Sequence, residues 1–176
     1  MDLINLFDKD DGLAKEDILS RLEMFAKELR QGTTVIVIGA ASIILTIDSE
    51  RKTTNVDIFN TTRVASYLKY DIQIINEDIL FLCEDYRNRL ILKANFEGIL
   101  VYTLGLLDVA LIKLGRGLDK DIEDIKEILQ SGVVSIEQFK FKYKEFRYGY
   151  GGSFEILDNN YWAVVGEKFI SNDRMF

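Results

Sequence analysis

The segment from Val35 to Asn60 constrains the fold of this chain more than any other part of its sequence. It reads as a buried, β-branched strand that ends at Gly39, then a helix of small and apolar residues, then a second strand. The second strand carries Asn55 and Asp57, and residues two apart in a strand project to the same side. The first turn of the helix offers N–H groups for phosphate, and the two side chains offer oxygen ligands for a metal ion. The segment therefore predicts a nucleotide site.

Length and composition are typical of a globular protein. The 176 residues give room for one domain, or for two small ones that share a core. With 48% hydrophobic and 29% charged residues, the chain can bury a core. No apolar run approaches the ~20 residues of a membrane helix, and the first residues are acidic where a signal peptide would be basic. We therefore expect a cytoplasmic protein with no membrane partner.

The absence of histidine excludes several kinds of catalytic site. A Ser-His-Asp triad, a Cys-His pair and histidine-ligated zinc or iron are all ruled out. Chemistry must rest on carboxylates, lysine, arginine, hydroxyls or a hard cation. The net charge of −7 argues against a protein-wide attraction for nucleic acid, so we predict no DNA partner, although a local basic patch can still act. Cys83 is the only cysteine and is expected to be a buried structural thiol.

The first part of the chain, residues 1–104, predicts a small mixed sheet flanked by helices. Helices are expected over residues 13–30 and 40–47, and strands over residues 33–38, 56–59, 89–94 and 99–103. The last two strands flank the sequence Asn-Phe-Glu-Gly at 95–98, whose glycine suits a hairpin turn. The pattern between residues 62 and 83 stays ambiguous.

From about residue 105 the pattern becomes helical. Helices are expected over residues 106–114, 119–130, 135–148 and 160–170, with Gly115 and Gly117 between the first two and Asp119 capping the second. We therefore predict an α+β (mixed α/β) protein whose second part, residues 105–176, is a helical bundle.

Four short patches occur in order between residues 35 and 130. The first is Gly39-Ala40-Ala41-Ser42 and the second is Thr53-Thr54-Asn55-Val56-Asp57. The third reads DYRNRL over residues 85–90, and the fourth is a helical stretch that carries Asp108, Lys113, Lys120, Asp121 and Asp124. In this order the patches resemble the nucleotidyltransferase-fold superfamily. They are most similar to its branch of abortive-infection (AbiEii-like) toxins and related bacterial proteins.

The resemblance implies Mg²⁺-dependent transfer of a nucleoside monophosphate from an NTP to an RNA or protein acceptor. It also implies a toxin–antitoxin or phage-defence setting, with a cognate toxin or antitoxin as partner. Asp57 and Asn55 would hold the Mg²⁺ ion, and Asp57, Lys113 and Asp121 would be the catalytic residues. The expected nucleotide-binding residues are Gly39, Ala40, Ser42, Arg51, Thr53 and Lys120.

Two departures from the family pattern favour a second interpretation. Asn55 stands where the family has its first metal-binding aspartate, and an amide brings no negative charge to a Mg²⁺ site. The expected strand RLILKA offers only Lys93, so a third carboxylate is not identified. The alternative is a catalytically silent member of the fold that acts by binding a nucleotide or a protein partner.

Several of these features also have a purely structural interpretation. The Gly39 patch suits tight strand-to-helix packing, and the charged residues of the fourth patch suit a solvated helix face. A third hypothesis is an RNA-binding helix that uses the basic residues Lys140, Lys142, Lys144 and Arg147. Its structural alternative is an amphipathic bundle helix, because Phe139, Tyr143, Phe146 and Tyr150 share one face.

Overall fold

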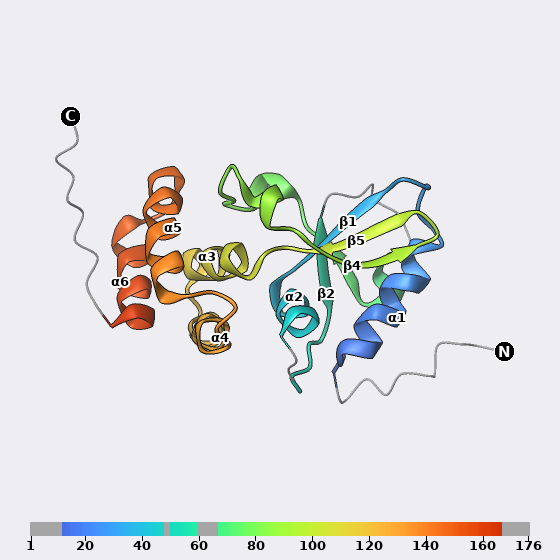
Figure 1. Ribbon diagram of the computed structural model, residues 1–176, viewed down its shortest axis with the longest axis horizontal. Helices are drawn as coiled ribbons and strands as arrows, with labels where there is room; N and C mark the ends of the chain where they lie inside the picture. The colour runs from blue at the N-terminus through green and yellow to red at the C-terminus, as the bar shows by residue number, and fades with distance from the viewer. Residues whose placement is uncertain (1–11, 48–49, 60–66, 167–176) are drawn as a thin grey trace. The chain divides into compact units, whose positions relative to one another are not determined.

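The structure is a computed structural model that describes residues 12–47, 50–59 and 67–166. It divides into two compact units, and Figure 1 shows the elements of each. The first unit holds the chain up to Glu77 together with Leu90–Leu104, and the second holds Asp78–Arg89 together with the chain from Gly105 onwards. The predicted α+β fold class is confirmed, since one unit contains a mixed sheet and the other contains helices.

The first unit is built on a five-stranded sheet of order β3-β2-β1-β5-β4. The strands are β1 (Thr34–Ile38), β2 (Val56–Phe59), β3 (Ile72–Ile74), β4 (Ile91–Phe96) and β5 (Ile99–Thr103). Strand β1 is central, antiparallel to β2 and parallel to β5. Its β-branched sequence, TVIVI, suits a strand that is buried on both faces.

Two helices, α1 (Lys15–Ala26) and α2 (Gly39–Thr46), share a core with this sheet. Ile18, Leu22 and Phe25 recur on α1 at helical spacing and are almost fully buried. From the sheet, alternate residues such as Val35 and Val37 join the same cluster. The helix predicted over residues 13–30 is shorter than expected, because the α-helix ends at Ala26 and residues 27–29 form turns and a bend.

The β4–β5 hairpin corrects one sequence prediction. The strand expected over residues 89–94 runs instead from Ile91 to Phe96, and Arg89 lies in a 3₁₀ turn. The turn is shorter than the predicted four residues: only Glu97 and Gly98 separate the strands, and both have positive φ. Two-residue hairpin turns with positive φ match the twist of the flanking strands, which explains the longer pairing.

In its described residues the second unit contains four α-helices: α3 (Leu106–Arg116), α4 (Asp119–Gln130), α5 (Ile136–Gly149) and α6 (Phe154–Val165). Gly115 was expected between the first two helices but lies inside α3, whereas Gly117 is the left-handed residue that ends it. The predicted cap at Asp119 is wrong, since Leu118 is the N-cap and Asp119 is the first helical residue.

Helix α6 was expected over residues 160–170 but begins at Phe154, where the Ser153 side chain accepts a hydrogen bond from the Ile156 N–H. It ends at Val165, and residues 167–170 lie outside the described part of the chain. No helix in the described ranges is long and apolar enough to cross a bilayer.

Aromatic rings fill the space between α5 and α6. Phe139, Tyr143 and Phe146 are buried along one face of α5, which confirms the predicted amphipathic face. The ring of Tyr143 stacks on Tyr161 of α6 with centroids 4.2 Å apart. Cys83, in the segment before Arg89, is buried as expected, and burial raises the pKa of its thiol to about 11.

Gly105, the N-cap of α3, lies in very close contact with Arg89. A Cβ atom at this position would lie 2.8 Å from the Arg89 carbonyl oxygen and 2.9 Å from its Cβ. We therefore expect Gly105→Ala to lower the free energy of unfolding by about 1–3 kcal/mol, because backbone would have to move. Chemical denaturation measures this change.

Gly149→Ala is the matched control, because nothing lies within 4 Å of the added Cβ. This position ends α5, so alanine should leave stability unchanged or raise it slightly. Equal unfolding free energies for the two alanine variants would contradict the close contact at Gly105.

Candidate functional site

The turn from β1 into α2 brings Gly39 and Asp57 together. Ile38, the last residue of β1, pairs directly with Asp57 on β2. Gly39 follows with φ of 65°, a conformation that favours glycine. A Cβ atom at Gly39 would lie only 3.3 Å from Oδ2 of Asp57. The missing side chain therefore lets the carboxylate approach the first turn of α2.

Asp57 projects from the face of the sheet opposite the α1 core. Its neighbours Val56 and Ile58 are fully buried in that core, and alternate residues of a strand face opposite sides. Gln73 on β3 pairs with Asp57 and belongs to the same face. The sequence alone does not identify Gln73, because β3 lies in the stretch whose pattern is ambiguous.

The amide of Asn55 is directed at Asp57. Its Nδ2 donates to Oδ1 of Asp57 at 2.6 Å and to Oε1 of Gln73 at 3.2 Å. The predicted pair of metal ligands is thus adjacent, but the amide presents its nitrogen to the carboxylate. A half-turn of the amide would direct its oxygen to the same place.

The first turn of α2 supplies backbone donors beside this carboxylate. N–H groups in the first turn of a helix have no acceptor within it, and they carry the positive end of the helix dipole. Gly39 and Ala40 occupy these positions. Ser42 is fully buried, and its hydroxyl donates to the carbonyl of Leu104 at 2.9 Å. A phosphate contact through the Ser42 hydroxyl would require it to leave Leu104.

Thr53 and Arg51 precede β2 in the chain. The backbone of Thr53 forms a two-way bridge with Leu13, with N···O distances of 2.6 and 3.0 Å. The Thr53 hydroxyl donates to the carbonyl of Asn55 at 3.1 Å, which fixes the approach to the strand. Thr53 is buried and Arg51 is half-buried. The contacts of Thr53 therefore support the loop that leads to Asn55.

In the second unit, Lys113 and Asp121 meet in a buried ionic cluster. Lys113 Nζ lies 3.0 Å from Oδ1 of Asp121 and 2.6 Å from Oδ2 of Asp124. All three side chains are nearly inaccessible to solvent, at 1–6% exposure. The cluster joins α3 to α4, so these contacts support the packing of the two helices. Lys120, one residue before Asp121, is exposed.

Arg116 completes the charge balance around Asp121. Its Nε and Nη2 lie 2.7 and 2.5 Å from the two carboxylate oxygens, and the Leu118 N–H donates to Oδ2 at 3.3 Å. Burial opposes ionisation of Asp121, but the hydrogen bonds from Arg116 and Lys113 outweigh it, and the pKa of the carboxyl is lowered. Asp121 is therefore an anion that caps α4 and pairs with two cations.

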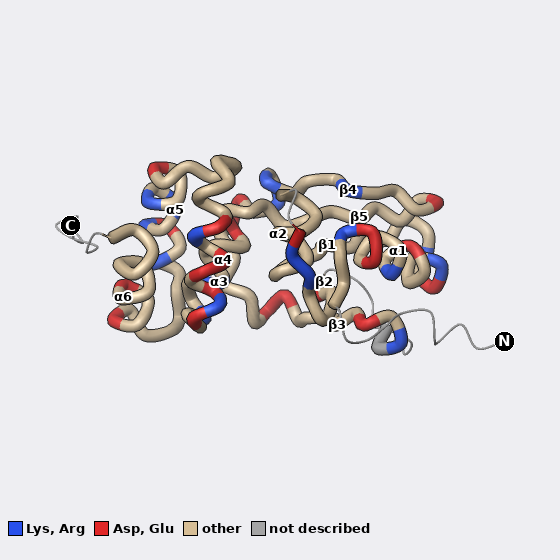
Figure 2. Tube along the Cα trace, turned by 90° about the horizontal axis from the view of Figure 1, so that it is seen from below, with Lys and Arg blue, Asp and Glu red and all other residues tan. Residues whose placement is uncertain are grey.

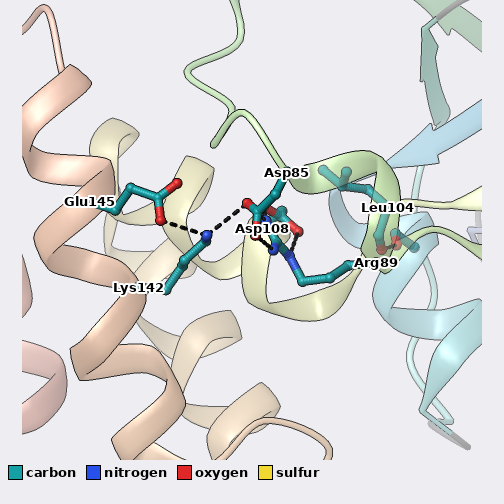
Figure 3. Close-up of polar contacts among 7 residues, drawn as sticks. Asp85, Arg89, Leu104, Asp108, Lys142 and Glu145 are labelled. Atoms are coloured by element: carbon teal, nitrogen blue, oxygen red, sulfur yellow. Dashed lines mark hydrogen bonds and ion pairs between the residues drawn. The ribbon is translucent and has the colours of Figure 1, made fainter.

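A second ionic cluster connects the third and fourth sequence patches (Figure 3). Arg89 binds Asp108 through two hydrogen bonds of 2.7 Å and binds Asp85 through two more, at 2.6 and 2.9 Å. Lys142 of α5 lies 2.7 Å from Asp85 and 2.6 Å from Glu145. Hydrogen bonds from Arg89 and then Lys142 hold the pKa of Asp85 well below its usual range.

The sequence contains a signal for this pairing, because Asp108 lies within the apolar run LLDVALI. The third patch contributes Arg89 and the fourth contributes Asp108, which is buried at 1% exposure. A buried aspartate needs a cation with several donors, and arginine presents such a fork.

The basic residues of α5 do not form a continuous cationic face. Lys142 is held by Asp85 and Glu145, and Arg147 donates to both oxygens of Asp158 at 2.8 and 3.0 Å. Figure 2 shows acidic and basic positions interspersed over the helices of this unit. These contacts support the amphipathic bundle helix.

The side chains beside Gly39 fit a divalent-cation site that has only one charged ligand. Asp57 supplies one carboxylate, and Asn55 and Gln73 supply neutral amides. Magnesium sites often use one or two carboxylates together with substrate phosphates. The described residues contain no group of three or more acidic or cysteine side chains that could hold a metal ion, and β4 and β5 carry no acidic residue.

Comparison with known families gives a match over residues 17–163 to the family described as nucleotidyltransferase of unknown function (DUF6036). The chain belongs to this nucleotidyltransferase family. The match takes in both units and all four patches on which the predicted resemblance was based. No curated protein and no solved structure gave a significant match. Membership of a nucleotidyltransferase family is thus confirmed, and the AbiEii-like branch stays a prediction.

Lys113 offers a test of whether the buried cluster is structural. Lys113→Met would remove the cation that Asp121 and Asp124 share, and would leave buried negative charge behind. We expect a loss of about 3 kcal/mol in unfolding free energy, the lower end of the range for breaking a buried ion pair, because Arg116 still neutralises Asp121. Thermal and urea unfolding measure the loss.

Lys120→Met is the control, since this exposed lysine should change stability by less than about 0.5 kcal/mol. A Lys113→Met protein as stable as the parent would contradict the structural role, and would favour the predicted catalytic role of Lys113.

Proposed function

We propose that this protein transfers a nucleoside monophosphate from an NTP to an acceptor in a Mg²⁺-dependent reaction. The observation that carries the proposal is the approach of the Asp57 carboxylate to the first turn of α2 at Gly39. Family membership supports the reaction class. In this arrangement Asp57 would supply an anionic ligand for a cation beside backbone N–H groups that would bind a phosphate chain.

The negative charge of Asp57 beside the first turn of α2 favours binding of a cation together with the nucleotide. A triphosphate at the start of α2 would meet the negative charge of Asp57, and two anions so close repel each other. When bound, Mg²⁺ would neutralise the triphosphate and favour its in-line alignment. Asp57 would hold the ion, and the N–H groups of Gly39 and Ala40 would bind phosphate oxygens. Attack by an acceptor hydroxyl on the α-phosphorus would form one P–O bond, break the bond from that phosphorus to the α,β-bridging oxygen, and release pyrophosphate and the hydroxyl proton.

The acceptor and the biological setting belong to the same proposal. The resemblance to the AbiEii-like branch supports an RNA or protein acceptor and a toxin–antitoxin or phage-defence role. The predicted contributions of Lys113, Asp121, Ser42, Arg51, Thr53 and Lys120 remain part of this proposal.

Calorimetric titration with ATP, GTP, CTP and UTP, with and without Mg²⁺, tests the site. We expect at least one NTP to bind, and to bind more tightly when Mg²⁺ is present. Asp57→Ala should weaken Mg²⁺-dependent binding by about tenfold or more, which corresponds to about 1.4 kcal/mol. Asp119→Ala removes the same charge from an exposed position and should leave binding unchanged.

The proposed site is wrong if the parent binds none of the four nucleotides, or if Asp57→Ala binds as the parent does. Incubation with radiolabelled NTP then tests turnover. Label on RNA or protein that disappears in Asp57→Ala supports transfer, whereas nucleotide binding without any labelled product supports the silent alternative.

The hydrogen bond from Asn55 to Asp57 favours that second candidate, a catalytically silent protein that binds nucleotide or a protein partner. A donor 2.6 Å from Oδ1 of Asp57 occupies a direction in which a cation would approach. It also stabilises the carboxylate without a metal ion. In this second candidate, the protein keeps the fold and the proposed phosphate-binding N–H groups of Gly39 and Ala40, but it no longer binds Mg²⁺ strongly.

Asn55→Asp tests whether the side chains at positions 55 and 57 can hold Mg²⁺ together. It would replace the hydrogen bond with two carboxylates in contact, so we expect the metal-free protein to lose about 1–3 kcal/mol of stability. Mg²⁺ should restore the loss and should bind at least tenfold more tightly than to the parent. Thermal unfolding over a Mg²⁺ series measures both effects.

Asn55→Ala is the matched control. It loses the same hydrogen bond but adds no charge, so Mg²⁺ should not restore its stability. If Mg²⁺ stabilises neither Asn55→Asp nor the parent, Asp57 and its neighbours do not form a cation site. The proposal of a Mg²⁺-dependent reaction is then wrong.

A further inference from the structure

One face of α5 carries large aromatic side chains that are directed away from the core. Phe141 is 75% exposed and Tyr148 is 93% exposed, although their neighbours Phe139 and Tyr143 are fully buried. At 100° per residue, Phe141 and Tyr148 lie within about 20° of each other around the helix. Isolated exposed apolar residues are common, but two large rings on one stripe of one helix are typical of a contact surface.

Two charged residues share this stripe. Glu137 lies one turn before Phe141 and Lys144 lies one turn after it, and both are exposed. Their separation of seven residues corresponds to about 10 Å along the helix, so they do not pair with each other. Among the residues that the structure describes, neither has an ion-pair partner. By contrast, Lys142 and Glu145, which are also on α5, form an ion pair with each other.

The order of these residues is self-complementary. If a second α5 crosses the first in the opposite direction about a two-fold axis at Phe141, each Glu137 faces the Lys144 of the other chain. The two Phe141 rings then meet at the axis. Tyr148, two turns further on, faces the region of Val133, which precedes α5 and is itself 52% exposed. An isologous contact of this kind repeats every favourable pair twice.

We propose that the outward face of α5, formed by Glu137, Phe141, Lys144 and Tyr148, is together with Val133 a dimer contact between two copies of this chain. The occupant is a second copy because the charges and rings complement the same stripe in reverse order. A single helix pair buries less surface than a standard stable interface, so the dimer is weak and concentration-dependent. This inference is independent of the proposed catalytic function.

Sedimentation velocity of the full-length protein over a concentration series tests the dimer. We expect the weight-average mass to rise from monomer towards dimer. E137K and K144E each replace both interchain ion pairs with like charges, and each should weaken dimerisation about tenfold or more. The double variant E137K/K144E restores opposite charges across the axis, and its dimerisation should return to that of the parent.

Thermal unfolding checks that the variants fold. Both residues are exposed, so we expect little change for K144E and a small decrease for E137K, whose glutamate lies in the first turn of α5. Phe141→Ser removes the central ring without altering charge, and should give a monomer over the same concentrations.

A parent protein that stays monomeric up to about 1 mM, where even a contact worth about 4 kcal/mol would be seen, overturns the proposal. A double variant that stays as weak as the single variants overturns the two-fold arrangement. Titration of the protein with a labelled single-stranded RNA tests whether the same face binds nucleic acid. Salt-sensitive RNA binding by a monomeric parent, lost in K144E, would assign this face to nucleic acid instead.

Discussion

The antiparallel pairing of Ile38 with Asp57 determines what the rest of the first unit can do. It fixes a carboxylate at the point where β1 ends and α2 begins, while Val56 and Ile58 on either side are held in the core. Because the flanking residues cannot leave the core without exposing apolar surface, Asp57 has little freedom to move away from the helix start. Gly39, which has no side chain, leaves room at the start of α2 for the Asp57 carboxylate. The site is therefore set by strand register and by the absence of one side chain.

Two clusters of charged residues hold the elements of the second unit together. Lys113 with Asp121 and Asp124, and Arg89 with Asp85 and Asp108, are two networks in which nearly every charge has an opposite partner. The buried pairs among them, such as Lys113 with Asp121, add little stability compared with an apolar core, but they are costly to break on one side. They also restrict which helix faces can pack together. The ordered charge motif on α3 and α4 thus has a sufficient structural explanation, whatever further role it has.

Much of the fold could be predicted from the sequence, because its elements have clear periodicity. The strands at Val56–Phe59 and Ile99–Thr103 and the helix at Asp119–Gln130 have the predicted bounds. Errors occurred where no local pattern decides, as at the start of α6 and in the tight turn after Phe96. At the site, alternation predicts that Asn55 and Asp57 project to one side, and their side chains do meet, although β2 begins one residue after Asn55. The approach of Gly39 depends on the pairing of Ile38 with Asp57. The role of Gln73 could not be predicted, because it depends on the pairing of β2 with a three-residue strand.

The Arg89–Asp108 pair also bears on how the chain can be divided. The main boundary between the two units lies between Leu104 and Gly105. The segment Asp78–Arg89 nevertheless belongs to the helical unit, although it precedes β4 and β5 of the sheet in the sequence. A fragment that begins at Gly105 would keep Asp108 in an apolar setting and lose the guanidinium that neutralises it. The helical unit is therefore discontinuous in sequence, and during synthesis its first segment must wait for the β4–β5 hairpin to emerge before it meets its partner helix.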